Sequence, residues 1–160
     1  MNDFRTIDFG GMLMDVLSGW EQPKGPDGNV ANQGRPPYSL VRRKLGVGVF
    51  QLSPALFQGG NPPAVSSALL LNMAERFGKM RDLGATSDVE ISESETLLLV
   101  GVTFRPREKF IRLWHGSDGL NFAFLTYGCD SGREVEELSD CERMARTIRF
   151  RKNDGPILKP

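Results

Sequence analysis

The sequence lacks most of the features that point to a particular chemistry. Its 160 residues include one histidine and two cysteines, and twenty Lys and Arg residues balance twenty Asp and Glu residues. Without a net charge, the chain has no overall field to attract nucleic acid or an anionic membrane. It has no apolar run near the ~20 residues that span a bilayer and no basic start followed by a signal-peptide core. We therefore expect a cytoplasmic protein that binds neither nucleic acid nor membrane.

The few reactive side chains do not form a pattern typical of a metal or catalytic site. Zinc sites need clustered Cys or His ligands, and two cysteines and one distant histidine do not supply that cluster. We expect His115 to be an edge or surface residue at the end of a strand. Cys129 is the better candidate for a nucleophile because a helix start nearby lowers a thiol pKa, but a buried, reduced thiol is the simpler interpretation for Cys129 and Cys141. We expect no catalytic residue, no metal and no cofactor.

The length and composition predict a single globular domain. Hydrophobic residues make up 39% of the chain and charged residues 25%, which is the balance of a folded protein rather than a disordered one. We place the domain at residues 1–152, followed by a frayed tail at 153–160. A loop at 23–37 is rich in glycine and proline. Loops longer than about 12–15 residues are often functional or mobile, so the role of this loop stays open.

Apolar spacing predicts the elements of the first half. Met12, Met14 and Val16 alternate with their neighbours as in a short strand, and 38–52 is expected to form one further strand. Asn61 before two prolines favours a helix start. A periodic apolar stripe predicts a helix over 62–83 that ends before Gly84 and packs across the sheet. The residues of that stripe are Val65, Leu69, Met73, Phe77 and Met80.

The second half is rich in predicted strands. Four of them, at 86–92, 96–104, 109–115 and 120–129, are joined by short turns and should form an antiparallel meander. Some are apolar on both faces, which indicates layers on both sides of the sheet. A helix after Gly132 and a short last strand complete the chain. The apolar face of that helix is predicted to contain Val135, Leu138, Cys141, Ala145 and Ile148. The expected fold class is α+β, an α/β/α sandwich around a central antiparallel sheet.

Charge is zoned although the total is zero. An acidic stretch spans 88–95, and a basic group surrounds the turn at 105–109. A solvated sheet edge, protected against aggregation, is the simpler explanation of such charges. A second acidic group at 134–142 needs no partner, because a helix N-terminus stabilises acidic side chains. The candidates for partner binding are Glu90, Glu93, Glu95, Arg105, Arg107 and Lys109.

Three segments, at 110–119, 122–130 and 137–150, resemble a known family. The first carries Phe110-Ile111-Arg112-Leu113-Trp114, the second ends Thr126-Tyr127-Gly128-Cys129, and the third ends Thr147-Ile148-Arg149-Phe150. They resemble small bacterial proteins with a PsbP-like α/β/α sandwich, whose last motif has a serine where Thr147 stands here. The resemblance implies binding modules without catalytic residues, a class that includes immunity proteins against the toxins of competing bacteria.

These inferences predict a non-enzymatic binding protein, as expected of a cytoplasmic immunity protein that occludes the active site of a cognate toxin. The partner would be a protein. It would contact the acidic stretch or the basic turn, with a slight preference for the acidic stretch because such toxins are often nucleases with basic clefts. Two alternatives stay open. One is a structural or assembly accessory module, for instance of a secretion system or as a homodimeric scaffold, and the other is a small enzyme that uses Cys129 or His115. If neither charged surface binds, the loop at 23–37 becomes the interface candidate.

Overall fold

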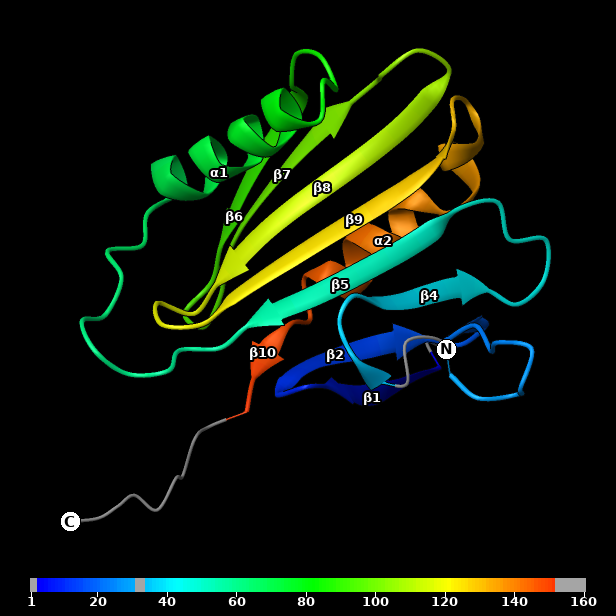
Figure 1. The fold of residues 1–160 in the computed structure, drawn as a ribbon, viewed down its shortest axis with the longest axis horizontal. Helices are drawn as coiled ribbons and strands as arrows, with labels where there is room; N and C mark the ends of the chain where they lie inside the picture. The colour runs from blue at the N-terminus through cyan, green and yellow to red at the C-terminus, as the bar shows by residue number, and fades with distance from the viewer. Residues whose placement is uncertain (1–2, 31–33, 152–160) are drawn as a thin grey trace.

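Two antiparallel sheets form the frame of the protein, as the computed structural model of residues 3–30 and 34–151 shows (Figure 1). The smaller sheet has the order β1-β2-β10, and the larger has the order β3-β4-β5-β9-β8-β7-β6. The strands are β1 Phe4–Phe9, β2 Met12–Leu17, β3 Trp20–Glu21, β4 Tyr38–Arg42, β5 Val49–Ala55, β6 Ser87–Glu93, β7 Leu98–Phe104, β8 Lys109–Ser117, β9 Phe122–Asp130 and β10 Arg149–Phe150. The helical segments are α1 Ser67–Met80, the short 3-10 helix η2 Arg133–Glu136 and α2 Leu138–Ala145.

The antiparallel meander expected in the second half is confirmed. Strands β6, β7, β8 and β9 follow one another in the chain and pair in that order. The pairing of β7 with β8 runs without interruption from Leu98 opposite Ser117 to Phe104 opposite Ile111. Together with the two helices, this large antiparallel sheet establishes the α+β fold class.

The large sheet is covered on both faces, as its two-sided apolar strands require. One face packs against α1 through a cluster that contains Ala74, Val102 and Leu113. The other face packs against β2 and α2 in a larger cluster, where Trp114 meets residues such as Met14. Helix α1 lies in front of the sheet in Figure 1, and α2 lies behind it. Helix α1 contacts mainly β7 and β8, and its Phe77 ring also lies 5.1 Å from the ring of Phe124 on β9.

Helix α1 is shorter than predicted and presents a different stripe to the sheet. It begins after Ser66 rather than Asn61, because the Ser66 hydroxyl accepts a hydrogen bond from the backbone N–H of Leu69 at 3.1 Å. Its buried residues are Leu70, Ala74 and Gly78. The expectation that Leu69 lies in the core was wrong, since Leu69 is only half-buried and the buried stripe is shifted by one residue.

The single strand expected over 38–52 is two strands joined by a reversal. Strands β4 and β5 pair antiparallel, with Tyr38 opposite Leu52 and Leu40 opposite Phe50. The connection at 43–48 includes Leu45, which has a positive φ of 55°. Its backbone is folded by hydrogen bonds from the Arg42 side chain, a local interaction that strand propensity does not reveal.

The C-terminal helix was also predicted with the wrong face at its start. Val135 lies in η2, before α2, and is 81% exposed, whereas Cys141 and Ala145 are buried as expected. Ile148 lies beyond the helix and is buried as well. The expected short last strand is β10, which pairs with β2. The tail predicted at 153–160, and residues 31–33 of the loop at 23–37, lie outside the described residues.

Candidate functional site

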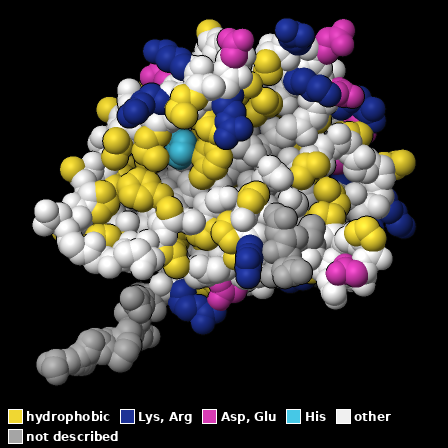
Figure 2. Space-filling model, in the orientation of Figure 1, with side chains coloured by type: hydrophobic (Ala, Val, Ile, Leu, Met, Phe, Trp, Pro, Cys, Tyr) yellow, Lys and Arg dark blue, Asp and Glu magenta, His cyan; other side chains and the backbone are white. Residues whose placement is uncertain are grey.

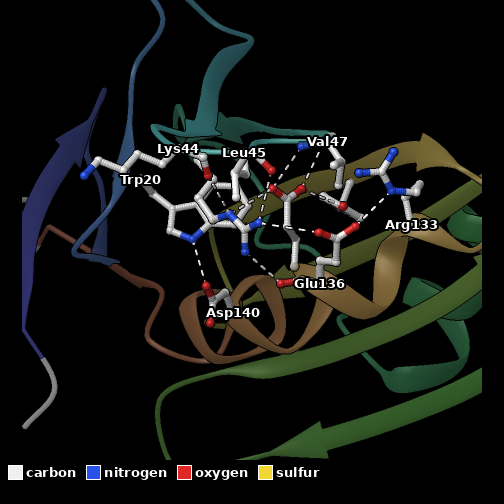
Figure 3. A network of polar contacts seen from close by, with 11 residues as sticks. Trp20, Lys44, Leu45, Val47, Arg133, Glu136 and Asp140 are labelled. Carbon is white, nitrogen blue, oxygen red and sulfur yellow. Dashed lines mark hydrogen bonds and ion pairs between the residues drawn. The ribbon is translucent and has the colours of Figure 1, made fainter.

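The buried carboxylate of Glu137 organises a polar network at one end of the large sheet (Figure 3). Glu137 precedes α2 and is 1% exposed. Its Oε1 accepts hydrogen bonds from the Gly48 backbone N–H at 3.0 Å and the Tyr127 hydroxyl at 2.8 Å. Its Oε2 accepts from the Val47 backbone N–H at 3.1 Å and lies 3.4 Å from Arg42 Nε. These contacts supply the partners that a buried charge needs.

Arg42 completes the network from the opposite side. Its guanidinium donates to the backbone oxygens of Lys44, Leu45 and Glu136. The segment 43–48 is therefore held between one cation and one carboxylate, as the converging dashed lines of Figure 3 show. Residues 90 or more positions apart in the chain meet in these contacts. The sequence reasoning missed this network, because Glu137 stood among acidic residues that the helix dipole explained, and charge alone does not show which of them is buried.

The network is suited to holding a loop rather than to acid–base chemistry. Both Glu137 oxygens are occupied by donors, so no free lone pair faces solvent for proton abstraction. Burial raises the pKa of the Tyr127 phenol well above its usual range, and the nearby Cys129 and Glu137 raise it further. The phenol is therefore protonated at neutral pH and serves as a donor.

The remaining reactive side chains are withdrawn from solvent. Cys129 and Cys141 are free and buried. Burial raises the pKa of both thiols, so neither is a ready thiolate. The expectation that His115 is an edge or surface residue was wrong. It lies on β8, an interior strand of the large sheet, and is 7% exposed. Burial lowers its pKa from 6.5 to about 4.

The acidic candidates lie on edge strand β6 and in the turn that follows it. Glu90 is already engaged within the protein, 3.2 Å from Arg146 and 4.0 Å from Arg112. Glu93 and Glu95 are exposed, and neither forms an ion pair with another described residue. Of the acidic stretch, only these two carboxylates are free for a partner.

The basic candidates lie at the opposite end of β7. Arg105 is paired with Asp88 at 3.8 Å and Glu134 at 3.7 Å. Lys109 is paired with Asp130 at 2.6 Å, and this bond raises the pKa of the Lys109 ammonium. Arg107 is exposed and has no carboxylate within ion-pair distance among the described residues. The seven residues of β7, roughly 20 Å, separate Glu93 and Glu95 from Arg105, Arg107 and Lys109, so the structure does not join these two groups in one site.

The basic group borders a hollowed surface, which we call the Ile111 groove. Three adjoining hollows of about 750, 710 and 430 Å³ share Ile111 in their lining. They run from the 43–48 loop, across the ends of β5, β9 and β8, to the end of α1 and the β7–β8 turn. The cations of the lining are Arg42, Arg43, Arg81, Arg105, Arg107 and Lys109, and the acids are Asp82, Glu108 and Asp130. Figure 2 shows Lys and Arg side chains at this end of the face, with Asp and Glu side chains among them.

Residues 3–30 and 34–151 contain no group of three or more His, Cys, Asp or Glu side chains arranged to hold a metal ion. In the same part of the chain, no helix has the length and apolar character needed to cross a membrane.

Comparison with known proteins reveals relatives in fold only. No protein-family model matches the chain, and no curated protein matches it. A crystal structure from Bacteroides thetaiotaomicron VPI-5482 is similar with a TM-score of 0.54 at 14% identity, over 93% of this chain and 48% of that one. LpqN of Mycobacterium tuberculosis, involved in cell envelope biogenesis, gives a TM-score of 0.49 at 12% identity, over 92% of this chain and 91% of that one. The chain thus spans about half the length of the first structure, whose likeness supports a sheet-dominated fold and does not define an activity.

Proposed function

We propose that the chain is a non-enzymatic binding protein and, more narrowly, an immunity protein that occludes the active site of a cognate toxin. The proposal is supported by one contrast. The side chains that could perform chemistry are buried or fully hydrogen-bonded, while unpaired charged side chains stand exposed near both ends of β7, with Glu93 and Glu95 at one end and Arg107 and Glu108 at the other. Exposed charges of that kind steer association and select a partner.

The resemblance of segments 110–130 and 137–150 to small bacterial PsbP-like proteins favours the narrower form of the proposal. Occlusion needs a rigid surface, because a loop that must be ordered on binding costs affinity. The Glu137 network supplies such rigidity to the 43–48 loop, which borders the Ile111 groove.

Co-purification tests the proposal. The chain is expressed together with the product of the neighbouring reading frame, and the complex is sized by light scattering. We expect a one-to-one complex and loss of the partner's toxicity. Self-association of the chain, or a large assembly without any effect on toxicity, would contradict the immunity proposal and favour an accessory module.

A matched pair of variants then locates the interface. Glu93→Lys with Glu95→Lys reverses the two free carboxylates, and Arg105→Glu with Arg107→Glu reverses the basic turn. Reversal of the surface that binds should slow association and reduce its salt dependence while folding is unchanged. The other pair serves as the control.

A further inference from the structure

Strand β6 leaves one edge of the large sheet open (Figure 1). It is the outermost strand on its side, and β7 is the one described element with which it forms extensive contacts. Six of its seven residues are exposed, among them Ile91 at 53%. An open edge presents backbone donors and acceptors with which a strand of another chain can pair.

The register of β6 shows which backbone groups face outward. The Ser94 N–H donates to the Leu97 oxygen at 2.9 Å, and the pairing with β7 continues from there along β6. Hydrogen-bonded and non-hydrogen-bonded positions alternate in an antiparallel pair. Ile91 and Glu93 therefore direct their N–H and C=O groups away from β7.

The first half of β6 is protected against pairing with another strand. The register shifts between Ser87 and Glu90, and the backbone oxygen of Asp88 accepts a hydrogen bond from Arg112 at 2.6 Å. A bulge of this kind blunts a sheet edge. The regular part that stays open therefore begins at Ile91 and leads into the turn that follows β6.

The unpaired charges beside this open part are negative. Glu93 and Glu95 are exposed, and neither forms an ion pair with another described residue. The segments 45–75, 82–104 and 113–132 supply the ends of β5, β6, β7, β8 and β9 on this side, and they contain no Lys or Arg.

The cations at the end of α2 and around β10 do not offset these two carboxylates. They are already paired with other acids of the protein: Arg146 with Glu90, Arg149 with Asp15 and Arg151 with Asp8. The open part of β6 therefore favours a ligand that bears positive charge.

A second copy of the chain is a poor occupant of this edge. Antiparallel pairing of two β6 strands sets one acidic strand beside another, and a two-fold axis at Glu93 would place two Glu93 side chains directly opposite each other. Like charges opposite each other destabilise a strand pair. A strand that carries Lys or Arg meets attraction in the same place.

We infer that the open edge of β6 binds an extended basic segment of the protein partner as an added strand. The backbone of that segment pairs with the outward groups of Ile91 and Glu93, and one of its apolar side chains packs on Ile91. Its Lys or Arg side chains pair with Glu93 and Glu95. This inference rests on the proposed protein-binding function, and it names the surface, the mode of pairing and the charge of the partner.

The test uses the full chain and a short fluorescein-labelled peptide that alternates lysine with valine. One control peptide has glutamate in place of each lysine. Another has N-methyl groups on two adjacent central residues, so that neither of its edges can pair fully. Binding is followed by fluorescence anisotropy at low and high salt. The lysine peptide should bind, less tightly at high salt, and both controls should bind at least about tenfold more weakly.

Amide hydrogen exchange identifies the mode of binding. The outward N–H groups of Ile91 and Glu93 should exchange rapidly in the free chain and become protected when the lysine peptide binds. The Ser92 N–H points toward β7, so its exchange should change little.

Proline substitutions test the edge. Ile91→Pro removes an outward N–H that makes no bond to β7, a position where a strand tolerates proline. Thr6→Pro is the matched control, because β1 is the edge of the smaller sheet and the same alternation directs the Thr6 N–H outward. Ile91→Pro should lower the affinity for the lysine peptide by about fivefold or more, and Thr6→Pro should change it by less than about twofold.

Neutral variants test the charge. Glu93→Gln with Glu95→Gln removes the two free carboxylates, and Asp82→Asn with Glu108→Gln removes two acids at the other end of β7. The first pair should lower affinity by about fivefold or more at low salt, and the second by less than about twofold.

Several outcomes would overturn the inference. These are no binding of the lysine peptide, equal binding of either control peptide, and unchanged exchange at Ile91 and Glu93 in the complex. If Ile91→Pro does not fold, the N-methylated peptide decides the mode of pairing. If a one-to-one protein complex forms and keeps its affinity in the Ile91 and Glu93/Glu95 variants, the inference fails and the proposed function stands. If no protein complex forms, the proposed function fails independently of the peptide result.

Discussion

Acid should destabilise this protein through its one histidine. His115 is buried on β8, its ring centroid lies 4.8 Å from that of Phe124, and burial lowers its pKa from 6.5 to about 4. Its Nε2 is the one buried side-chain N or O atom among the described residues that has no hydrogen-bond partner. Protonation would place a charge where no acceptor is available, so the folded state favours the neutral ring.

The direction and size of the effect follow from the two pKa values. Between pH 6.5 and about 4 the unfolded chain binds more protons than the folded one, so the free energy of unfolding falls as the pH falls. The stabilisation that comes from keeping His115 neutral is fully present above about pH 6.5. The full shift corresponds to about 3 kcal/mol, and about 2 kcal/mol of it is lost between about pH 7 and pH 5.

Urea unfolding at several pH values, followed by tryptophan fluorescence, measures the effect. Carboxylates also titrate toward low pH. The wild type is therefore compared with His115→Leu, which fills the same buried position with a side chain that does not titrate. The wild type should lose about 2 kcal/mol more than the variant between about pH 7 and pH 5. Parallel stability curves for the two proteins would refute the argument that burial controls this imidazole.

Three further variants test the packing and the polar network. Leu70→Ala should cost about 2–5 kcal/mol in urea unfolding because the side chain is fully buried, and half-buried Leu69→Ala should cost clearly less. Gly78→Ala should lower the stability by about 1–3 kcal/mol despite its better helix propensity, because its Cβ would clash with the buried Phe104 ring; a higher melting temperature would contradict this close approach. Tyr127→Phe removes one donor from a buried carboxylate and should cost about 1.5–3 kcal/mol, whereas an unchanged unfolding midpoint would show that the hydrogen bond contributes nothing net.

The strands of the meander could be predicted because their pattern is local. Alternation and turn residues fix the period and the breaks of β7, β8 and β9, and the structure places all three as expected. The helix stripe was predicted one residue out of register. The face of α1 that is buried depends on its contacts with the sheet. Gly78, for example, lies against the sheet because it has no side chain to clash with the Phe104 ring.

The candidate site was less accessible to sequence reasoning because it is assembled from distant parts of the chain. The basic turn at 105–109 was identified, but nothing in the sequence places Arg81 or Gly128 beside it. The sequence also does not show which acidic side chains are free and which form ion pairs. Glu90 and Glu93 look alike in the acidic stretch, yet one pairs with Arg146 and the other is free. His115 was misplaced because the end of its strand was predicted at 115, whereas β8 extends to Ser117.

The pairing of β2 with β10 links the order of synthesis to the completion of the fold. Leu13 lies opposite Arg149, and the Asp15 N–H donates to the Thr147 hydroxyl across 132 positions of sequence. On a ribosome, the β1–β2 hairpin is made well before β10, so one edge of β2 has no partner until residues 149–150 have emerged. Contacts of such large sequence separation slow folding and leave strand edges exposed in the meantime. A nascent chain stalled before residue 147 would therefore present an unpaired edge of β2, and this edge is where a chaperone would be expected to engage it.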